Sequence, residues 1–204
     1  MNNVFSVLLL VIFVISSFGQ FQGLSVGVEG KIYIFEILVF LFSLSGFIFL
    51  FLSKKEIKIS KYLILFSLFS LVAFLSLVAS LNQFGANKVL VSGFYLARIV
   101  IFLLYSIVVL NIFSLEKKEK LLNYAVLATT LVSIFGFAQL FFFPNLSDLP
   151  PELGWDPHIG RLVSTFFDPN FSGGFVVLGL VILLSKFSIS SKKIGNIFLI
   201  ITHV

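Results

Sequence analysis

The sequence predicts an all-α protein that crosses a membrane several times. Hydrophobic residues make up 59% of its 204 residues, charged residues make up 11%, and the mean hydropathy is +1.13. A water-soluble domain has about 25% charged residues, so this composition cannot cover a soluble surface. The apolar residues also occur in runs of about 20, the length that one helix needs to cross the hydrocarbon core. We therefore expect a polytopic transmembrane helical bundle.

The residue types exclude several kinds of chemistry. The chain contains no Cys, which rules out disulfides, thiolate nucleophiles and cysteine metal ligands. His158 and His203 lie far apart in the sequence, so a histidine metal site is not expected. We expect neither a metal nor a cofactor. The formal net charge of +5 does not predict a nucleic-acid partner, because the basic residues follow a membrane topology.

The first apolar run, residues 4–18, is slightly shorter than the roughly 20 residues of a spanning helix. It has the length of a signal peptide, but the preceding residues, Met-Asn-Asn, lack the positive charge that a signal peptide carries. We interpret it as an uncleaved first helix. Residues 20–30, which are polar and contain glycine, predict a loop.

Six further apolar runs complete a prediction of about seven helices in a single transmembrane domain, 1–204. They cover residues 32–52, 62–81, 89–115, 121–143, 171–184 and 194 onward. The connection 144–168 is long beside its neighbours. The seventh run would extend only about 16 Å before Val204, roughly half the hydrocarbon core. We therefore expect the chain to be the N-terminal part of a longer protein.

The basic residues predict the orientation. Ten of the fourteen Lys and Arg residues lie in alternate connections between the predicted helices. These are Lys54, Lys55, Lys58, Lys61, Lys117, Lys118, Lys120, Lys186, Lys192 and Lys193. The opposite connections hold only Lys31, Lys88 and Arg161. Because cytoplasmic loops are enriched in Lys and Arg, the N-terminus is predicted to be cytoplasmic and the 144–168 loop extracytoplasmic.

Polar chemistry concentrates in residues 154–174, GWDPHIGRLVSTFFDPNFSGG. Arg161 lies on the side that is poor in basic residues, and a guanidinium presents a rigid fork of donors that matches phosphate oxygens. The alternative for Arg161 is an ordinary surface ion pair with Asp156 or Asp168. His158 is interpreted as a solvated loop residue rather than as a base.

The tripeptide Asp168-Pro169-Asn170 has a strong structural interpretation. Asp is a favoured helix N-cap and Pro is favoured at the first helical position, so the tripeptide is expected to start the sixth helix. Within the predicted membrane segments, the ionisable residues that need a partner or a cavity are Glu36 and Arg98. We expect both in the outer half of the membrane, lining a cavity on the side of the loop. A buried structural pair, or snorkelling of Arg98, is the alternative.

The segment RLVSTFFDPNFSGG, residues 161–174, resembles the signature of the O-antigen ligase and polymerase family of bacterial membrane proteins. Members commonly carry an Arg, then Thr-Phe, then Pro-Asn opening a transmembrane helix with small residues. The matching positions here are Arg161, Thr165-Phe166, Pro169-Asn170 and Gly173-Gly174. Asp168 occupies a position that varies in the family.

The resemblance implies transfer of a glycan from an undecaprenyl-diphosphate carrier to a glycan or lipid acceptor. The reaction would take place without metal at the outer face of a bacterial cytoplasmic (inner) membrane. Arg161 matches the position that grips the diphosphate, and the expected substrate-binding set is Arg161, Arg98, Asp168 and Asn170. The family's candidate base is a His in a later loop, expected beyond residue 204. No catalytic residue is assigned here, and the chain alone is expected to be catalytically incomplete.

Two other functions stay open at this stage. A transporter or flippase for lipid-linked sugars needs polar lining through both membrane halves, whereas Glu36 and Arg98 are both expected in the outer half. A structural membrane subunit for polysaccharide export would complete its seventh helix with a partner chain.

Overall fold

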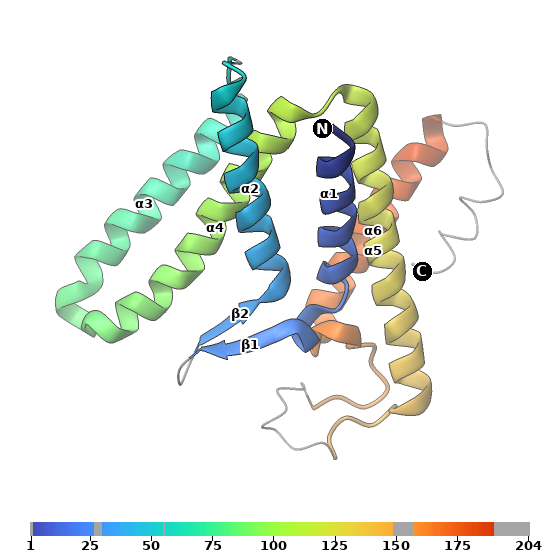
Figure 1. Ribbon diagram of the computed structural model, residues 1–204. Helices are drawn as coiled ribbons and strands as arrows, with labels where there is room; N and C mark the ends of the chain where they lie inside the picture. Colours follow the sequence, from blue (N-terminus) through green and yellow to red (C-terminus); the bar gives the residue numbers. More distant parts are fainter. Residues whose placement is uncertain (1, 27–29, 55, 149–156, 190–204) are drawn as a thin grey trace. The chain divides into compact units, whose positions relative to one another are not determined.

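A computed structural model describes residues 2–26, 30–54, 56–148 and 157–189 (Figure 1). The elements in these ranges are α1 (Asn2–Ser16), η1 (Gly19–Gln22), β1 (Gly23–Val26), β2 (Gly30–Tyr33), α2 (Ile34–Leu52), α3 (Lys61–Phe84), α4 (Ala86–Ile112), α5 (Leu115–Phe142), η3 (Ser164–Phe166) and α6 (Pro169–Ile189). The prediction of a seventh helix from residue 194 onward lies outside the described residues.

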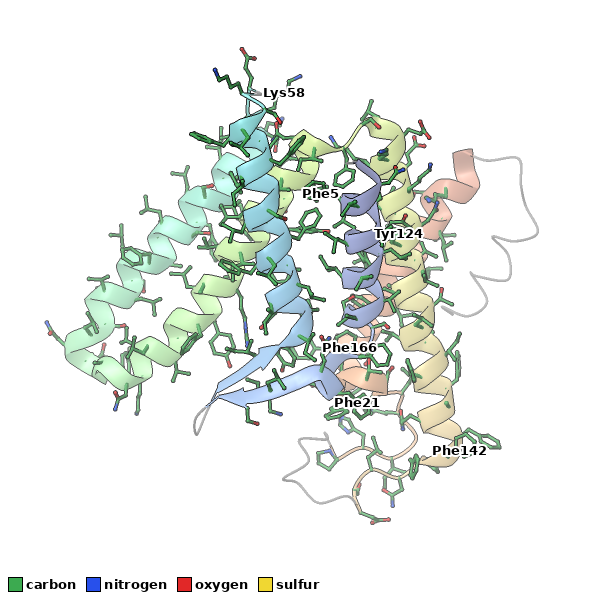
Figure 2. All side chains as sticks on the ribbon, viewed as in Figure 1. Phe5, Phe21, Lys58, Tyr124, Phe142 and Phe166 are labelled. Atoms are coloured by element: carbon green, nitrogen blue, oxygen red, sulfur yellow. The ribbon has the colours of Figure 1, made fainter. Side chains whose placement is uncertain are left out.

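Within the described residues, five helices are long and apolar enough to cross a membrane, namely α2, α3, α4, α5 and α6. Large apolar side chains point outward, as Figure 2 shows along α3. Leu65 and Phe69 of α3 are 63% and 58% exposed. Such a surface is stable only where hydrocarbon replaces water. The chain is therefore a helical, multi-pass membrane protein.

The chain divides into two compact units, and the first comprises residues 1–5 and 24–118. In this unit α4 packs against both α2 and α3. Close contact between α2 and α4 depends on Gly46, because a Cβ atom there would lie 2.2 Å from Cγ1 of Val108. Phe5 adds an edge-to-face contact with Phe42, with 5.5 Å between the ring centroids.

The loop predicted for residues 20–30 was wrong for the residues of this stretch that the structure describes, 20–26 and 30, and the fold is not purely helical. Residues 19–22 form η1, and β1 and β2 pair as a two-stranded sheet. Strands separated by so few residues must run antiparallel, because a parallel crossover needs a dozen or more residues. Backbone N–H and C=O groups that leave a membrane helix still need partners, and the strand pairing supplies them.

Two helix connections are shorter than predicted. Gly85 alone separates α3 from α4, and its φ of +78° is a conformation that Gly adopts readily. The basic loop predicted between residues 115 and 121 belongs to α5 instead. Lys and Glu are good helix formers, so the helix continues beyond the apolar run. Lys118 Nζ also donates to the carbonyl of Leu110 at 2.9 Å, near the end of α4.

The second unit comprises residues 6–23 and 119–204, of which residues 149–156 and 190–204 lie outside the described ranges. In this unit α1 lies beside α5, with ring contacts from Phe13 to Tyr124 and from Phe18 to Phe135. Tyr124, which belongs to α5, is labelled in Figure 2. After α5, two segments of the following connection are joined by a backbone hydrogen bond in which Leu146 N donates to the carbonyl of His158 at 3.0 Å.

Candidate functional site

Residues 162–167, which we call the strap, join the loop after α5 to the start of α6. Buried hydrogen bonds join the strap to α5 and to the residue after α1. Gln139 Oε1 of α5 accepts from Val163 N at 3.0 Å, and Ser164 Oγ donates to the carbonyl of Val132 at 2.6 Å. Thr165 Oγ1 donates to the carbonyl of Ser17 at 2.7 Å. The strap is therefore fixed to both α5 and the end of α1.

Two glycines allow the strap to lie this close to its neighbours. A Cβ atom on Gly136 would lie 2.4 Å from Cδ2 of Leu162, and one on Gly19 would lie 2.4 Å from the carbonyl oxygen of Thr165. The second contact is with backbone, which cannot move aside as a side chain can. The rings of Phe21 and Phe167 pack together next to Gly19, with 4.9 Å between their centroids. Figure 2 labels Phe21 and the neighbouring Phe166.

The strap backbone adopts a conformation that side-chain-bearing residues rarely take. Ser164 has φ +50° and Phe167 has φ +62°, both in the left-handed region. Such residues cost of order 1–3 kcal/mol each and persist only where the surroundings hold them. The buried bonds of Ser164 and Thr165 provide that restraint. The strap is consequently a rigid segment and not an adaptable loop.

The predicted cap of α6 is confirmed. Asp168 Oδ1 accepts from the backbone N–H groups of Asn170 at 2.7 Å and Phe171 at 3.0 Å. Pro169 occupies the first helical position. Ser172 Oγ also donates to the carbonyl of Val163, which fastens the first turn of α6 to the strap. Asp168 thus has a structural role as the N-cap of α6. The side chain of Asn170 is exposed.

Arg161 lies directly before the strap and is exposed. Among the residues that the structure describes, it makes no ion pair within 4 Å, so the alternative pair with Asp168 does not form. Asp156, the other partner considered, lies outside the described residues. Arg161 therefore presents its charge at the surface from a segment whose next residues are fixed.

Glu36 and Arg98, the ionisable residues of the predicted membrane segments, form an ion pair in the first unit. Arg98 Nε lies 2.8 Å from Glu36 Oε1, and the side chains are 23% and 11% exposed, respectively. Glu36 Oε2 also accepts from Tyr33 N at 3.1 Å. Arg98 donates further to the carbonyl of Lys31 and lies 5.0 Å from the ring centroid of Tyr95.

The ion pair predicted as the alternative is present, and the paired side chains also line a cavity. That this cavity opens on the side of the 144–168 loop stays a prediction. The cavity has a volume of about 220 Å³ and lies between α2 and α4. Lys31, Glu36 and Arg98 supply its charged groups, and the rest of the lining is mostly apolar. Arg98 belongs to the first unit and Arg161 to the second, so a single site that contains both arginines stays a prediction.

The sequence analysis missed Gln139, Ser164 and Ser172, which hold the strap. A signal for Gln139 was present, since it is a polar side chain in an otherwise apolar stretch of α5. Gly136, one helical turn earlier, was a second signal of close packing on the same helix face. The positions of their partners in the strap follow from the fold and not from local spacing.

Among the described residues, no three His, Cys, Asp or Glu side chains are grouped so as to hold a metal ion. No protein-family model, curated protein or solved structure matches the chain. The fold and the described residues define a multi-pass helical membrane protein with an exposed arginine before a rigid strap and an ion pair between two spanning helices.

Proposed function

We propose that the chain takes part in glycan transfer from an undecaprenyl-diphosphate carrier at the outer face of a bacterial cytoplasmic membrane. The observation that carries the proposal is the setting of Arg161. It is an exposed cation without an ion-pair partner among the described residues, and the segment after it is held by buried hydrogen bonds. A diphosphate leaving group develops negative charge, and a cation held in place stabilises that charge without reorganisation.

The arrangement of basic residues supports the outer-face location. Exposed Lys54, Lys58 and Lys61 lie around the connection between α2 and α3. This connection is at the opposite end of α2 from β2. Successive connections alternate between the two faces of the membrane. With the lysine-rich connections in the cytoplasm, the connection that carries Arg161 therefore faces outward. A lipid-linked glycan presented at that face would meet Arg161 directly.

The two arginines have different roles in this proposal. Glu36 balances the charge of Arg98, so Arg98 is a weaker diphosphate ligand than Arg161. We assign the diphosphate contact to Arg161. Asp168 and the backbone of Asn170 fix the start of α6 beside the strap and so support the position of Arg161.

The test is to delete the gene that encodes this chain from its host and to analyse the lipid-linked glycans by mass spectrometry. We expect undecaprenyl-diphosphate glycan to accumulate at the outer face, where a membrane-impermeant oxidant such as periodate modifies it in intact cells. Accumulation protected from the oxidant would identify a flippase instead. An unchanged lipid-linked pool would reject both functions and leave a structural subunit.

A point variant separates the role of Arg161 from the presence of the protein. Arg161→Ala should reproduce the accumulation at an unchanged protein level. Lys88→Ala is the matched control, because Lys88 is also an exposed cation on the side that is poor in basic residues. If both variants behaved as the unmodified protein does, Arg161 would not contact the carrier.

A further inference from the structure

The cavity between α2 and α4, which we call the groove, is lined by residues of one face of each helix. Its lining includes Ile37 and Phe40 of α2 and Val91, Phe94 and Ile101 of α4. The α4 positions are spaced three to seven residues apart, which places them on one side of the helix. Figure 1 shows α4 leaning away from α2 toward the end where β2 enters α2. The groove therefore lies where these two spanning helices separate.

The charged residues lie partway along the apolar lining of the groove. In α4, Arg98 is seven residues after Val91 and three residues before Ile101. Arg98 pairs with Glu36 near the start of α2, and further along the two helices Phe42 contacts Tyr105, so α2 and α4 run in the same direction. Ile37, Phe40 and Ile101 therefore lie on one side of the ion pair. A hydrocarbon chain whose phosphate lies at the ion pair would contact these three apolar residues.

The charged side chains that line the groove have a net charge of +1. Lys31 and Arg98 contribute two cations, and Glu36 contributes one carboxylate. The ion pair with Glu36 uses Arg98 Nε, and the bond to the Lys31 carbonyl uses one terminal nitrogen. Among the described residues, the remaining guanidinium N–H groups of Arg98 have no hydrogen-bond acceptor, which leaves donors for an oxyanion.

We propose that this groove binds one anionic phospholipid of the bilayer. Its phosphate lies at Lys31 and Arg98, and one acyl chain lies between α2 and α4. The net positive charge selects an anionic headgroup, and the apolar lining of two membrane-spanning helices takes the chain. The inference does not depend on the proposed glycan transfer.

The experiment measures lipid retained by the full chain with native mass spectrometry, using phosphatidylglycerol and phosphatidylcholine as probes. We expect one phosphatidylglycerol to bind saturably and more tightly than phosphatidylcholine, whose headgroup has no net charge. Lys31→Gln should weaken phosphatidylglycerol binding by about fivefold, the contribution typical of one lysine near an anionic lipid surface.

A second variant tests the groove itself without removing a charge. Ala97 lines the groove and is exposed, so Ala97→Trp should fill it and abolish the saturable binding while the protein stays folded. Ala79→Trp is the control, because Ala79 is an exposed position of α3 outside the groove. It should leave lipid binding unchanged.

Three results would overturn the inference. The first is equal retention of the two phospholipids, and the second is unchanged retention in Ala97→Trp. The third is displacement of phosphatidylglycerol by undecaprenyl diphosphate at equal concentration, which would make the groove part of the carrier site. Loss of phospholipid binding in Lys31→Gln with normal carrier binding would separate this groove from the role proposed for Arg161.

Discussion

Gln139→Leu removes the side chain that fixes the strap to α5 while keeping a similar volume. Gln139 is 9% exposed, and its Oε1 accepts from Val163 N at 3.0 Å. The contact with Ser164 N, at 3.5 Å, is at the limit of a hydrogen bond. We therefore count one buried N–H left without an acceptor, which costs about 1–3 kcal/mol. The other lost partner, the carbonyl of Phe143, lies on an exposed residue and can bind water.

The consequence is measurable by hydrogen exchange of the full chain in detergent or nanodiscs. Exchange of the Val163 amide should accelerate roughly 5- to 150-fold, since 1–3 kcal/mol corresponds to that ratio. Gln83→Leu is the matched control, because Gln83 is exposed in α3 and its loss should not change exchange in the strap. Unchanged Val163 exchange in Gln139→Leu would refute the account of the strap.

Three further predictions concern the helix cap, the helix packing and the orientation. Asp168→Ala should lower the free energy of unfolding by about 1 kcal/mol, because the cap of α6 is lost. Asn170→Ala should leave it unchanged, and equal effects of the two variants would contradict the cap. Gly46→Ala should destabilise the protein by about 1–3 kcal/mol through overpacking, and adding Val108→Ala should restore it; a failed rescue would place the clash elsewhere. Because the chain has no Cys, Ser147→Cys should react with an impermeant maleimide in intact cells, and labelling only after lysis would reverse the proposed orientation.

The sequence predicted the membrane class and the approximate positions of the helices that the structure describes. The run predicted at 32–52 is α2, Ile34–Leu52, because an apolar stretch of this length has few other stable structures in a bilayer. The helix ends were predicted less well. Hydropathy marks where a helix leaves the hydrocarbon, whereas α5 begins at Leu115 and includes Lys117 and Lys118 because lysine continues a helix in water.

The parts of the site differ in how far the sequence determines them. Glu36 and Arg98 were predictable as partners because charges within membrane segments need a counter-charge. Asp168 was predictable as a cap because capping depends on neighbouring residues. The partner of Gln139 was not predictable, because Val163 is 24 residues away and approaches only once the strap is folded.

The Gly-dependent contacts show the same limit. A glycine in an apolar helix signals that something lies close to it, without specifying what. Gly136 faces Leu162 and Gly19 faces Thr165, and both partners belong to the strap. Neither contact follows from a local pattern. The folded structure was needed to show that the segment after Arg161 is rigid.

The most direct test of the central claim is the affinity of the full chain for undecaprenyl diphosphate in lipid nanodiscs. Arg161→Ala should weaken binding by about tenfold, the lower end of the effect of losing a charge-assisted hydrogen bond. Arg161→Lys should recover part of the loss, because lysine keeps the charge without the fork of donors. Lys88→Ala should bind as the unmodified chain does. Unchanged affinity in Arg161→Ala, or an equal loss in Lys88→Ala, would contradict the account.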